Sequence, residues 1–455
     1  MESNQGNRES FATKFGVIAA TAGSAVGLGN IWRFPYLVGE NGGAAFLLVY
    51  LGFVLMIGIP VMLSEFIIGR KARKNPYGAF RMLAPGKPWF LVGLMGVAAA
   101  FMILAFYTTV SGWTLEYIYQ SVINGFDSKS GAQLSEMFTT FRSASWRPLL
   151  WFFVFMATTA AIIFLGVKKG IEKSTVILMP ALLGILVILC IRSLLLPGSM
   201  EGVKFLFNPD FSRLTGSSVL AALGQVFFSL SIGMGTLITY ASYFPSKDNL
   251  FSTSLSVAFT DTLVAMLAGV AIFPAVFSFH ITPGYGEGLV FVTLPGIFEQ
   301  MSGGTLFAVL FFVLLALAAL TSTISVLEVI VAFFVEQLNL TRRAATWIAA
   351  STVSLLGIFC TLSWNSALGG VKLFGLNIFE LLDFTSANIL LPIGGFFIVI
   401  FVAWFFGQDR AKAELSNEGT LKARYIPLYI FIIRFIAPVA LAVIFLNGLG
   451  LIRIG

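Results

Sequence analysis

The chain has 455 residues, of which 58% are hydrophobic and only 11% are charged. Soluble domains carry about 25% charged residues, so the composition excludes a chain of soluble domains and indicates a polytopic membrane protein. The net charge of +7 does not predict a nucleic-acid partner, because the Lys and Arg residues form short clusters between apolar runs instead of one basic face.

Apolar runs long enough to cross a bilayer recur along the chain, since a spanning helix needs about 20 mostly apolar residues. Residues 1–14 are predicted to be a polar cytoplasmic tail, and residues 281–302 an external loop with a short helix. Eleven spans are predicted between and after them, at residues 15–36, 44–69, 89–124, 150–166, 174–195, 218–243, 251–279, 305–337, 343–361, 377–406 and 427–453.

Positive charge predicts the orientation of these spans. With a cytoplasmic N-terminus, most of the 28 Lys and Arg residues lie in cytoplasmic loops, for example at 70–74 and 168–173. Cytoplasmic loops are enriched in Lys and Arg, so we expect the N-terminus inside and the C-terminus outside. No cleavage site precedes the first span, so no cleaved signal peptide is expected. The short loop after the third span has no glycosylation sequon, which favours a bacterial inner membrane.

Two spans are interrupted at mid-membrane depth. Residues 22–30 read Ala-Gly-Ser-Ala-Val-Gly-Leu-Gly-Asn, and residues 227–235 read Phe-Phe-Ser-Leu-Ser-Ile-Gly-Met-Gly. Glycine alone is compatible with close helix packing. Paired interruptions in corresponding positions of two halves indicate a midplane binding site of a secondary transporter, where helix N-termini attract a carboxylate and unwound carbonyls bind Na⁺.

Residues 23–36, Gly-Ser-Ala-Val-Gly-Leu-Gly-Asn-Ile-Trp-Arg-Phe-Pro-Tyr, and residues 40–43, Glu-Asn-Gly-Gly, resemble the signature of the neurotransmitter:sodium symporters. Similarity at residues 224–231, 239–243 and 318–322 extends the resemblance over nearly the whole chain. It implies an all-α membrane protein with a five-plus-five inverted repeat, the LeuT fold, in which helices 1 and 6 are broken. The first repeat would cover residues 15–195, the second 218–406, and an eleventh helix 427–453. Within the family the chain is most similar to bacterial carriers of hydrophobic amino acids.

The resemblance implies two sodium sites. One would combine the substrate carboxylate with Ala25, Asn30, Ser229 and Asp261. The other would use Gly23, Val26, Ala318, Thr321 and Ser322, whose carbonyl and hydroxyl oxygens suit Na⁺. The residues alone leave an alternative, in which Thr321 and Ser322 bond to carbonyls one turn back in their own helix.

Asp261 departs from the family pattern, because relatives usually carry Asn there. Animal members bind chloride among side chains whose positions match Tyr50, Gln225, Ser229 and Asp261. A carboxylate inside the membrane is costly and usually functional, so we expect Asp261 to supply the charge that chloride gives elsewhere and transport to need no chloride. The alternative is a partly hydrated Asp near a helix end.

The substrate site is likewise implied by the resemblance. Its residues would be Ala25, Leu28, Gly29, Ile103, Tyr107, Val110, Phe228, Ser229, Ser231, Met234, Ser322 and Val326. The amides of Leu28 and Gly29 and the Tyr107 hydroxyl would hold a carboxylate. Amine-transporting relatives have Asp where this chain has Gly27, which argues against a monoamine. The mostly apolar pocket favours a hydrophobic side chain, and the flexible Met234 favours tolerance of several sizes unless it is ordinary core.

The resemblance also assigns two gates. The outer gate would pair Arg33 with Asp383, above a lid of Tyr107 and Phe228. The inner gate would pair Arg8 with Glu336, near Tyr243 and an aromatic plug at Phe11.

The fifth span has Gly170 at its inner edge and Pro180 inside, and both residues weaken a helix. We expect its inner segment to unwind and admit water to the second sodium site, although a static kink explains Pro180 equally well. Glu65 and Glu328 lie inside spans and are expected to have hydrogen-bonded structural roles.

Together these features predict a Na⁺-coupled symporter that imports aliphatic and aromatic L-amino acids by alternating access. A channel needs a continuous polar pore, whereas the polar groups cluster at one depth. An enzyme needs a catalytic set, which one His and two Cys inside apolar runs do not provide. A proton-coupled or exchange-only carrier on the same fold stays open, because Asp261 and Glu65 are titratable. The oligomeric state is not predicted.

Overall fold

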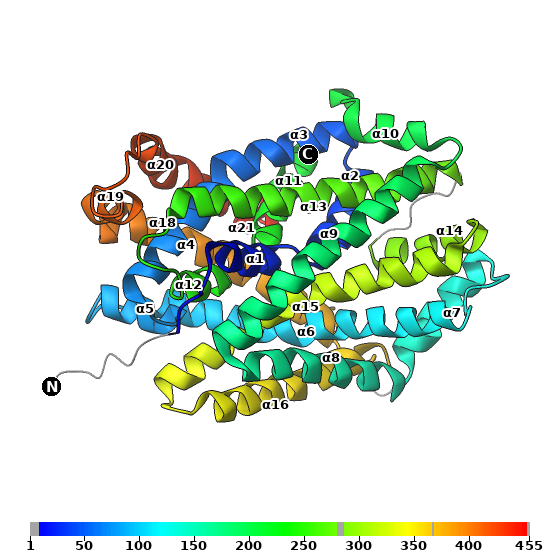
Figure 1. The fold of residues 1–455 in the computed structure, drawn as a ribbon, viewed down its shortest axis with the longest axis horizontal. Coiled ribbons are helices and arrows are strands. Elements are labelled where there is room, and N and C mark those ends of the chain that lie inside the picture. Colours follow the sequence, from blue (N-terminus) through cyan, green and yellow to red (C-terminus); the bar gives the residue numbers. More distant parts are fainter. Residues whose placement is uncertain (1–8, 280–285, 366–367, 453–455) are drawn as a thin grey trace.

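The computed structural model describes residues 9–279, 286–365 and 368–452, which form a bundle of helices (Figure 1). Within these residues, nine uninterrupted helical segments are long and apolar enough to cross a membrane. They are Ala44–Ala72 (α3, η2 and α4), Phe90–Val122 (α6), Arg147–Phe164 (α8), Val167–Leu194 (η3 and α9), Leu250–Ser278 (α13), Gly304–Gln337 (α15), Arg342–Trp364 (α16 and η6), Ile378–Phe406 (α17, η7, α18 and η8) and Ile426–Gly448 (α20, η9 and α21).

The first predicted span is bent by 54° between α1 (Lys14–Ala25) and the helix formed by η1 (Gly29–Arg33) and α2 (Phe34–Glu40). The Thr13 side chain begins α1 by accepting a hydrogen bond from the Gly16 amide. At the other end Val26 has extended backbone angles, so the helix stops at mid-depth. This is the interruption that the glycines of residues 23–29 predict.

The sixth predicted span is also broken. It consists of α11 (Gly216–Ser229) and α12 (Thr236–Ala241), joined by unwound residues 230–235. Ser231, Gly233 and Gly235 have φ values of 55°, 85° and 78°, in the left-handed region. A Cβ on Gly233 would lie 2.6 Å from the Leu391 carbonyl oxygen, so the turn requires glycine there. With the bent first span and the nine uninterrupted segments, the described residues supply the eleven predicted spans.

The loops hold further helices, most of which the sequence did not reveal. Four α-helices in the described loops were not predicted, namely α5 (Pro76–Leu83), α7 (Gly131–Ser143), α10 (Ser199–Phe207) and α19 (Gln408–Leu415), and neither was the short 3-10 helix η4 (Phe211–Arg213). The helix expected in residues 281–302 is present as η5 (Leu289–Thr293) and α14 (Leu294–Gln300), while residues 281–285 lie outside the described residues. In Figure 1, α5 and α19 lie at one end of the bundle and α7, α10 and α14 at the other.

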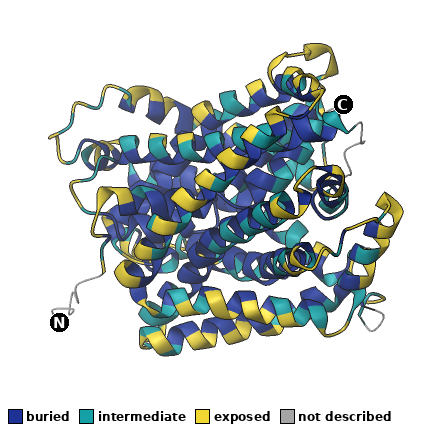
Figure 2. Cartoon of the chain, turned by 45° about the vertical axis from the view of Figure 1, so that its right-hand side comes forward, coloured by how far each residue is buried: buried dark blue, intermediate teal, exposed yellow. Residues whose placement is uncertain are grey.

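The broken spans lie in the middle of the bundle. Helix α1 packs against α9, α13 and α15, and α6 packs along much of α15. Buried residues concentrate in these central helices, whereas the outer faces of peripheral helices carry the exposed residues (Figure 2). Unwound backbone is therefore kept away from lipid, where an unpaired polar group costs several kcal/mol.

Candidate functional site

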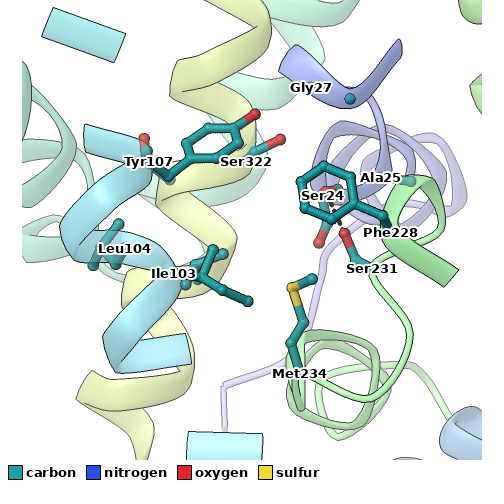
Figure 3. Close-up of a pocket in the computed structure, with 13 residues that line it drawn as sticks. Ser24, Ala25, Gly27, Ile103, Leu104, Tyr107, Phe228, Ser231, Met234 and Ser322 are labelled. Carbon is teal, nitrogen blue, oxygen red and sulfur yellow. Dashed lines mark hydrogen bonds between the residues drawn. The ribbon is translucent and has the colours of Figure 1, made fainter. Parts of the chain in front are cut away.

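A small cavity lies where the two broken spans meet α6 and α15 (Figure 3). The lining residues are Ser24, Ala25, Gly27, Gly29, Ile103, Leu104, Tyr107, Phe228, Ser231, Met234, Ser322, Thr323 and Val326.

One end of the cavity is polar. The Leu28 amide donates a hydrogen bond of 2.7 Å to the Tyr107 hydroxyl oxygen, which leaves the hydroxyl proton available to an acceptor. A Cβ on Gly27 would lie 2.4 Å from the Ser322 Oγ and 2.5 Å from the Tyr107 hydroxyl oxygen. Glycine at position 27 therefore keeps open the space between these two hydroxyls.

The other end of the cavity is apolar. Figure 3 shows Ile103 and Met234 facing each other there, and Phe228 closes one side. The Met234 thioether is flexible, so this end can adapt its shape to an apolar side chain.

Most of the predicted substrate residues meet in this cavity. Nine of the twelve line it. The cavity also includes Gly27, which the sequence analysis singled out for the space it leaves, and Ser24, Leu104 and Thr323, which the resemblance did not assign. Leu104 and Thr323 each neighbour an assigned residue. Leu28 and Val110 instead line a second, outer cavity, and Ser229 lies in a cluster around Asp261.

Asp261 is fully buried within α13 and accepts several hydrogen bonds. The Ser229 hydroxyl lies 3.0 and 2.8 Å from its carboxylate oxygens, the Asn30 amide 2.7 Å and the Tyr50 hydroxyl 3.4 Å. The alternative of a hydrated Asp near a helix end does not fit this environment. Ala25, the remaining residue of this predicted sodium site, lies in the neighbouring cavity wall.

Oxygen atoms of the second predicted sodium site also lie close together. The Thr321 hydroxyl lies 3.3 Å from the Val26 carbonyl and 2.9 Å from the Ala318 carbonyl, and the Ser322 hydroxyl lies 3.2 Å from the Val26 carbonyl. A Cβ on Gly23 would lie 3.3 Å from the Thr321 Cβ, so glycine permits this close approach. The Thr321 hydroxyl is thus within hydrogen-bonding distance of a carbonyl of its own helix, as the alternative expected, and of a carbonyl of the broken first span, as the sodium site expected.

These oxygen atoms fit Na⁺ by their chemistry. Carbonyl and hydroxyl oxygens with at most one carboxylate suit a hard monovalent cation. The described residues contain no group of three or more His, Cys, Asp or Glu side chains placed to hold a metal ion.

An outer cavity adjoins the first one, and Gly29, Tyr107 and Phe228 line both. The predicted outer-gate residues Arg33 and Asp383 lie in its wall. The Arg33 guanidinium carbon lies 4.5 Å from the centroid of the Phe228 ring. Among the described residues no ion pair joins Arg33 to Asp383, so in this conformation the predicted pair is not closed.

At the inner side, the predicted gate falls partly outside the described residues, because Arg8 is not among them. The Glu336 carboxylate accepts hydrogen bonds of 3.0 and 2.8 Å from the backbone and side-chain amides of Asn75. The Tyr243 hydroxyl donates to Glu328 over 2.6 Å, and Glu328 pairs with Arg342 at 2.6 Å.

The segment before α1 packs under the broken helices. The Phe11 side chain is buried and contacts the rings of Tyr240, Tyr243 and Phe244. The Glu172 carboxylate accepts hydrogen bonds of 2.8 Å from the Ala12 amide and from the Thr13 hydroxyl. This segment therefore packs against α12 and η3, at the end of the bundle where the sequence predicts the inner gate.

The inner part of the fifth span is wound in this conformation. Residues Val167–Glu172 form the π-helix η3, and Pro180 lies inside α9 (Lys173–Leu194). A Cβ on Gly170 would lie 2.0 Å from the Ile162 carbonyl oxygen, so glycine is also needed here for close packing. The unwinding expected at Gly170 and Pro180 stays a prediction.

The two carboxylates that were expected to have structural roles, Glu65 and Glu328, both have partners. The Glu65 carboxylate accepts a hydrogen bond of 2.7 Å from the Gly233 amide in the unwound part of the sixth span. The Glu328 carboxylate accepts a hydrogen bond from Tyr243 and forms an ion pair with Arg342. Both carboxylates are therefore hydrogen-bonded.

Comparisons with known proteins agree with this geometry. The Sodium:neurotransmitter symporter family matches residues 8–130 and 126–453. An uncharacterized sodium-dependent transporter of Bacillus subtilis, YhdH, is 40% identical over 97% of this chain and 98% of its own length. An uncharacterized sodium-dependent transporter of Haemophilus influenzae is 37% identical over 99% of this chain and 100% of its own. The crystal structure of MhsT in complex with L-phenylalanine is 47% identical, with a TM-score of 0.89 over 97% of this chain and 100% of that one.

Proposed function

Because this chain belongs to the sodium:neurotransmitter symporter family, a family of transporters and not of enzymes, we propose that it imports hydrophobic L-amino acids by Na⁺ symport. It is a multi-pass membrane protein with the LeuT fold of its structural relative. The proposal adds the substrate class, the ions and the direction of transport.

The observation that carries the proposal is the two-ended cavity. Its polar end offers the Tyr107 hydroxyl and the Gly29 backbone to a carboxylate, and its apolar end offers Ile103, Met234 and Val326 to a side chain. A zwitterion with an apolar side chain satisfies both ends. The complex of MhsT with L-phenylalanine supports a ligand of this kind.

Gly27 supports an amino acid over a monoamine. A monoamine has an ammonium group and no carboxylate, so it needs a carboxylate from the protein. A side chain at position 27 would meet the Tyr107 and Ser322 hydroxyls at once. The cavity is therefore suited to a ligand that brings its own carboxylate to these hydroxyls.

Two Na⁺ ions would bind beside the cavity. The first would sit among Asn30, Ser229 and Asp261, next to the substrate carboxylate, so ion and substrate would bind as a unit. The second would sit among the carbonyls of Gly23, Val26 and Ala318 and the hydroxyls of Thr321 and Ser322, bridging the broken first span to α15. Each ion would stabilise the arrangement that holds the substrate, which couples the two.

Transport is proposed to be independent of chloride. The Asp261 carboxylate is within hydrogen-bonding distance of Ser229 and Tyr50, two of the positions that match the chloride-binding side chains of animal relatives, and of the sodium-site residue Asn30. Its fixed negative charge would balance the adjacent Na⁺ without an added anion.

Alternating access would use the two sides described above. The outer cavity reaches the Tyr107 and Phe228 rings, whereas the Phe11 segment closes the inner side. On the outer side, Arg33 would pair with Asp383 and close the outer cavity. On the inner side, the Phe11 segment would be released and the helix would unwind near Gly170 and Pro180. Together these changes would produce the inward-open state. We place the N-terminus inside and the C-terminus outside in a bacterial inner membrane, following the positive-inside rule.

The test is uptake of radiolabelled Leu and Trp into proteoliposomes in chloride-free buffer, with inward gradients of Na⁺, K⁺ or H⁺ imposed separately. Accumulation of both amino acids with Na⁺ alone is expected. Accumulation driven by H⁺, or uptake only into vesicles preloaded with amino acid, would refute Na⁺ symport. Uptake of a single aliphatic residue would refute the broad pocket.

A further inference from the structure

A groove open to the membrane runs between α8 and α16, and none of its lining residues belongs to the cavities described above. It encloses about 1440 Å³, including its open side. Small side chains on the two helices form its floor, namely Ala157, Ala160, Ala161, Ala350, Ser351 and Ser354. The larger side chains of Phe153, Leu165 and Trp347 line its edges and are exposed.

The groove has the length of one lipid leaflet. Its lining on α8 and the residue after it extends from Phe153 to Leu165, about 18 Å at ~1.5 Å per helical residue. One leaflet of the hydrocarbon core is about 15 Å thick. A groove of this length along the helices matches a single acyl chain.

Positive charge gathers at one end of the groove. The Arg343 guanidinium carbon lies 5.2 Å from the ring centroid of Phe164, a groove residue, and Lys168 and Lys169 follow shortly after and are exposed. In the described part of the chain, no ion pair joins these three cations to a carboxylate. The preceding residue, Arg342, instead turns inward to pair with Glu328 at 2.6 Å.

We propose that this groove binds one anionic phospholipid, with an acyl chain between α8 and α16 and the phosphate beside Arg343, Lys168 and Lys169. The apolar walls accept an acyl chain of any phospholipid, whereas the cations select a negatively charged headgroup. The exposed ring of Trp347 lies one turn from Arg343, and Trp is typical of the headgroup level of a membrane. The orientation proposed above puts this end at the cytoplasmic leaflet.

Native mass spectrometry of the full chain tests the proposal with equal amounts of phosphatidylglycerol and phosphatidylethanolamine that carry identical acyl chains. Preferential retention of one phosphatidylglycerol is expected. A cation near the membrane surface contributes about fivefold to affinity for an anionic lipid, so the combined variant Lys168→Gln, Lys169→Gln, Arg343→Gln should lose on the order of 100-fold. The control is Arg81→Gln, Lys87→Gln, Lys422→Gln, which removes three exposed charges that lie away from the groove.

A second pair of variants tests the acyl chain. Ala161→Phe fills the groove and should reduce retention of phosphatidylglycerol, whereas Ala181→Phe, at an exposed position of α9 outside the groove, should not. Equal retention of the two lipids, equal loss in the two charge variants, or equal behaviour of the two Phe variants would overturn the proposal. A lipid-free dimer that Ala161→Phe dissociates would assign the groove to a second copy of the chain. If Ala161→Phe fails to fold, the charge variants still decide.

Discussion

Replacing Asp261 with Asn removes one negative charge and little else. The amide oxygen of Asn can keep the hydrogen bond from the Asn30 side chain, now 2.7 Å, and its NH₂ group can donate to the Ser229 hydroxyl oxygen. The side chain has the same shape, so the packing of α13 is preserved. The variant therefore separates the charge of Asp261 from its structural role.

The size of the effect follows from the proximity of a bound Na⁺. A unit charge about 4 Å from another, at an effective dielectric constant near 20, interacts by about 4 kcal/mol. Since about 1.4 kcal/mol corresponds to a tenfold change in affinity, the half-saturating Na⁺ concentration should rise by about 10²- to 10³-fold in chloride-free buffer. Added chloride should recover part of this loss, because an anion can then take the place of the carboxylate.

The assay is Na⁺-dependent binding of radiolabelled L-phenylalanine to purified protein, titrated with Na⁺ with and without chloride. Asp127→Asn is the control, because Asp127 is an exposed carboxylate in the loop after α6. An unchanged Na⁺ titration for Asp261→Asn would refute the role assigned to this charge. Chloride dependence of the wild-type protein would refute it as well.

Three further variants test the remaining contacts. Gly27→Ala should lower phenylalanine affinity more than tenfold, because the new Cβ displaces two cavity hydroxyls. The control Gly224→Ala should leave the affinity unchanged, because a Cβ there has no atom within 4 Å. Equal effects of the two variants would contradict the argument. Tyr107→Phe should weaken binding by about 1.5–3 kcal/mol, the worth of a hydrogen bond to a charged group, and equilibrium binding with wild-type affinity would exclude the hydroxyl from the carboxylate site. Glu172→Gln, made in a Phe11→Cys background, should weaken the hydrogen bond to the Ala12 amide and speed labelling of the new thiol at position 11. The two native cysteines are buried, so they add little to the labelling. Unchanged labelling would show that Glu172 does not hold the segment.

The spans and their interruptions were predictable because their causes are local. Apolar length identifies a span, and the glycines near residues 27 and 233 identify a break, since backbone in the left-handed region or in close contact needs glycine. The loop helices were less visible. Helix α5 begins after Asn75, whose side chain accepts a hydrogen bond from the Gly78 amide, and the amides of Asn75 also bond to Glu336 from a distant part of the chain. The local cap is present in the sequence, whereas the tertiary contact is not visible there.

Much of the candidate site was also predictable, but only through the family motif. No periodicity places Tyr107 beside Leu28, or Asn30 beside Asp261, because these pairs join helices far apart in the sequence. Whether each gate is open or closed could not be predicted from the sequence, for another reason. Arg33 stacks on Phe228 here and is expected to pair with Asp383 in another state, and one sequence encodes both arrangements.

The hydroxyl of Ser231 donates a hydrogen bond of 2.8 Å to the Ser24 carbonyl, joining the unwound stretch of the sixth span to the end of α1 at the break in the first span. Ser231 holds a φ of 55°, which costs a residue other than glycine about 1–3 kcal/mol. Glycine would relieve this strain and lose the bond. The chain thus gives up some conformational stability to tie one repeat to the other, and because the acceptor is a main-chain carbonyl, this bond constrains the residue at position 231 and not the one at position 24.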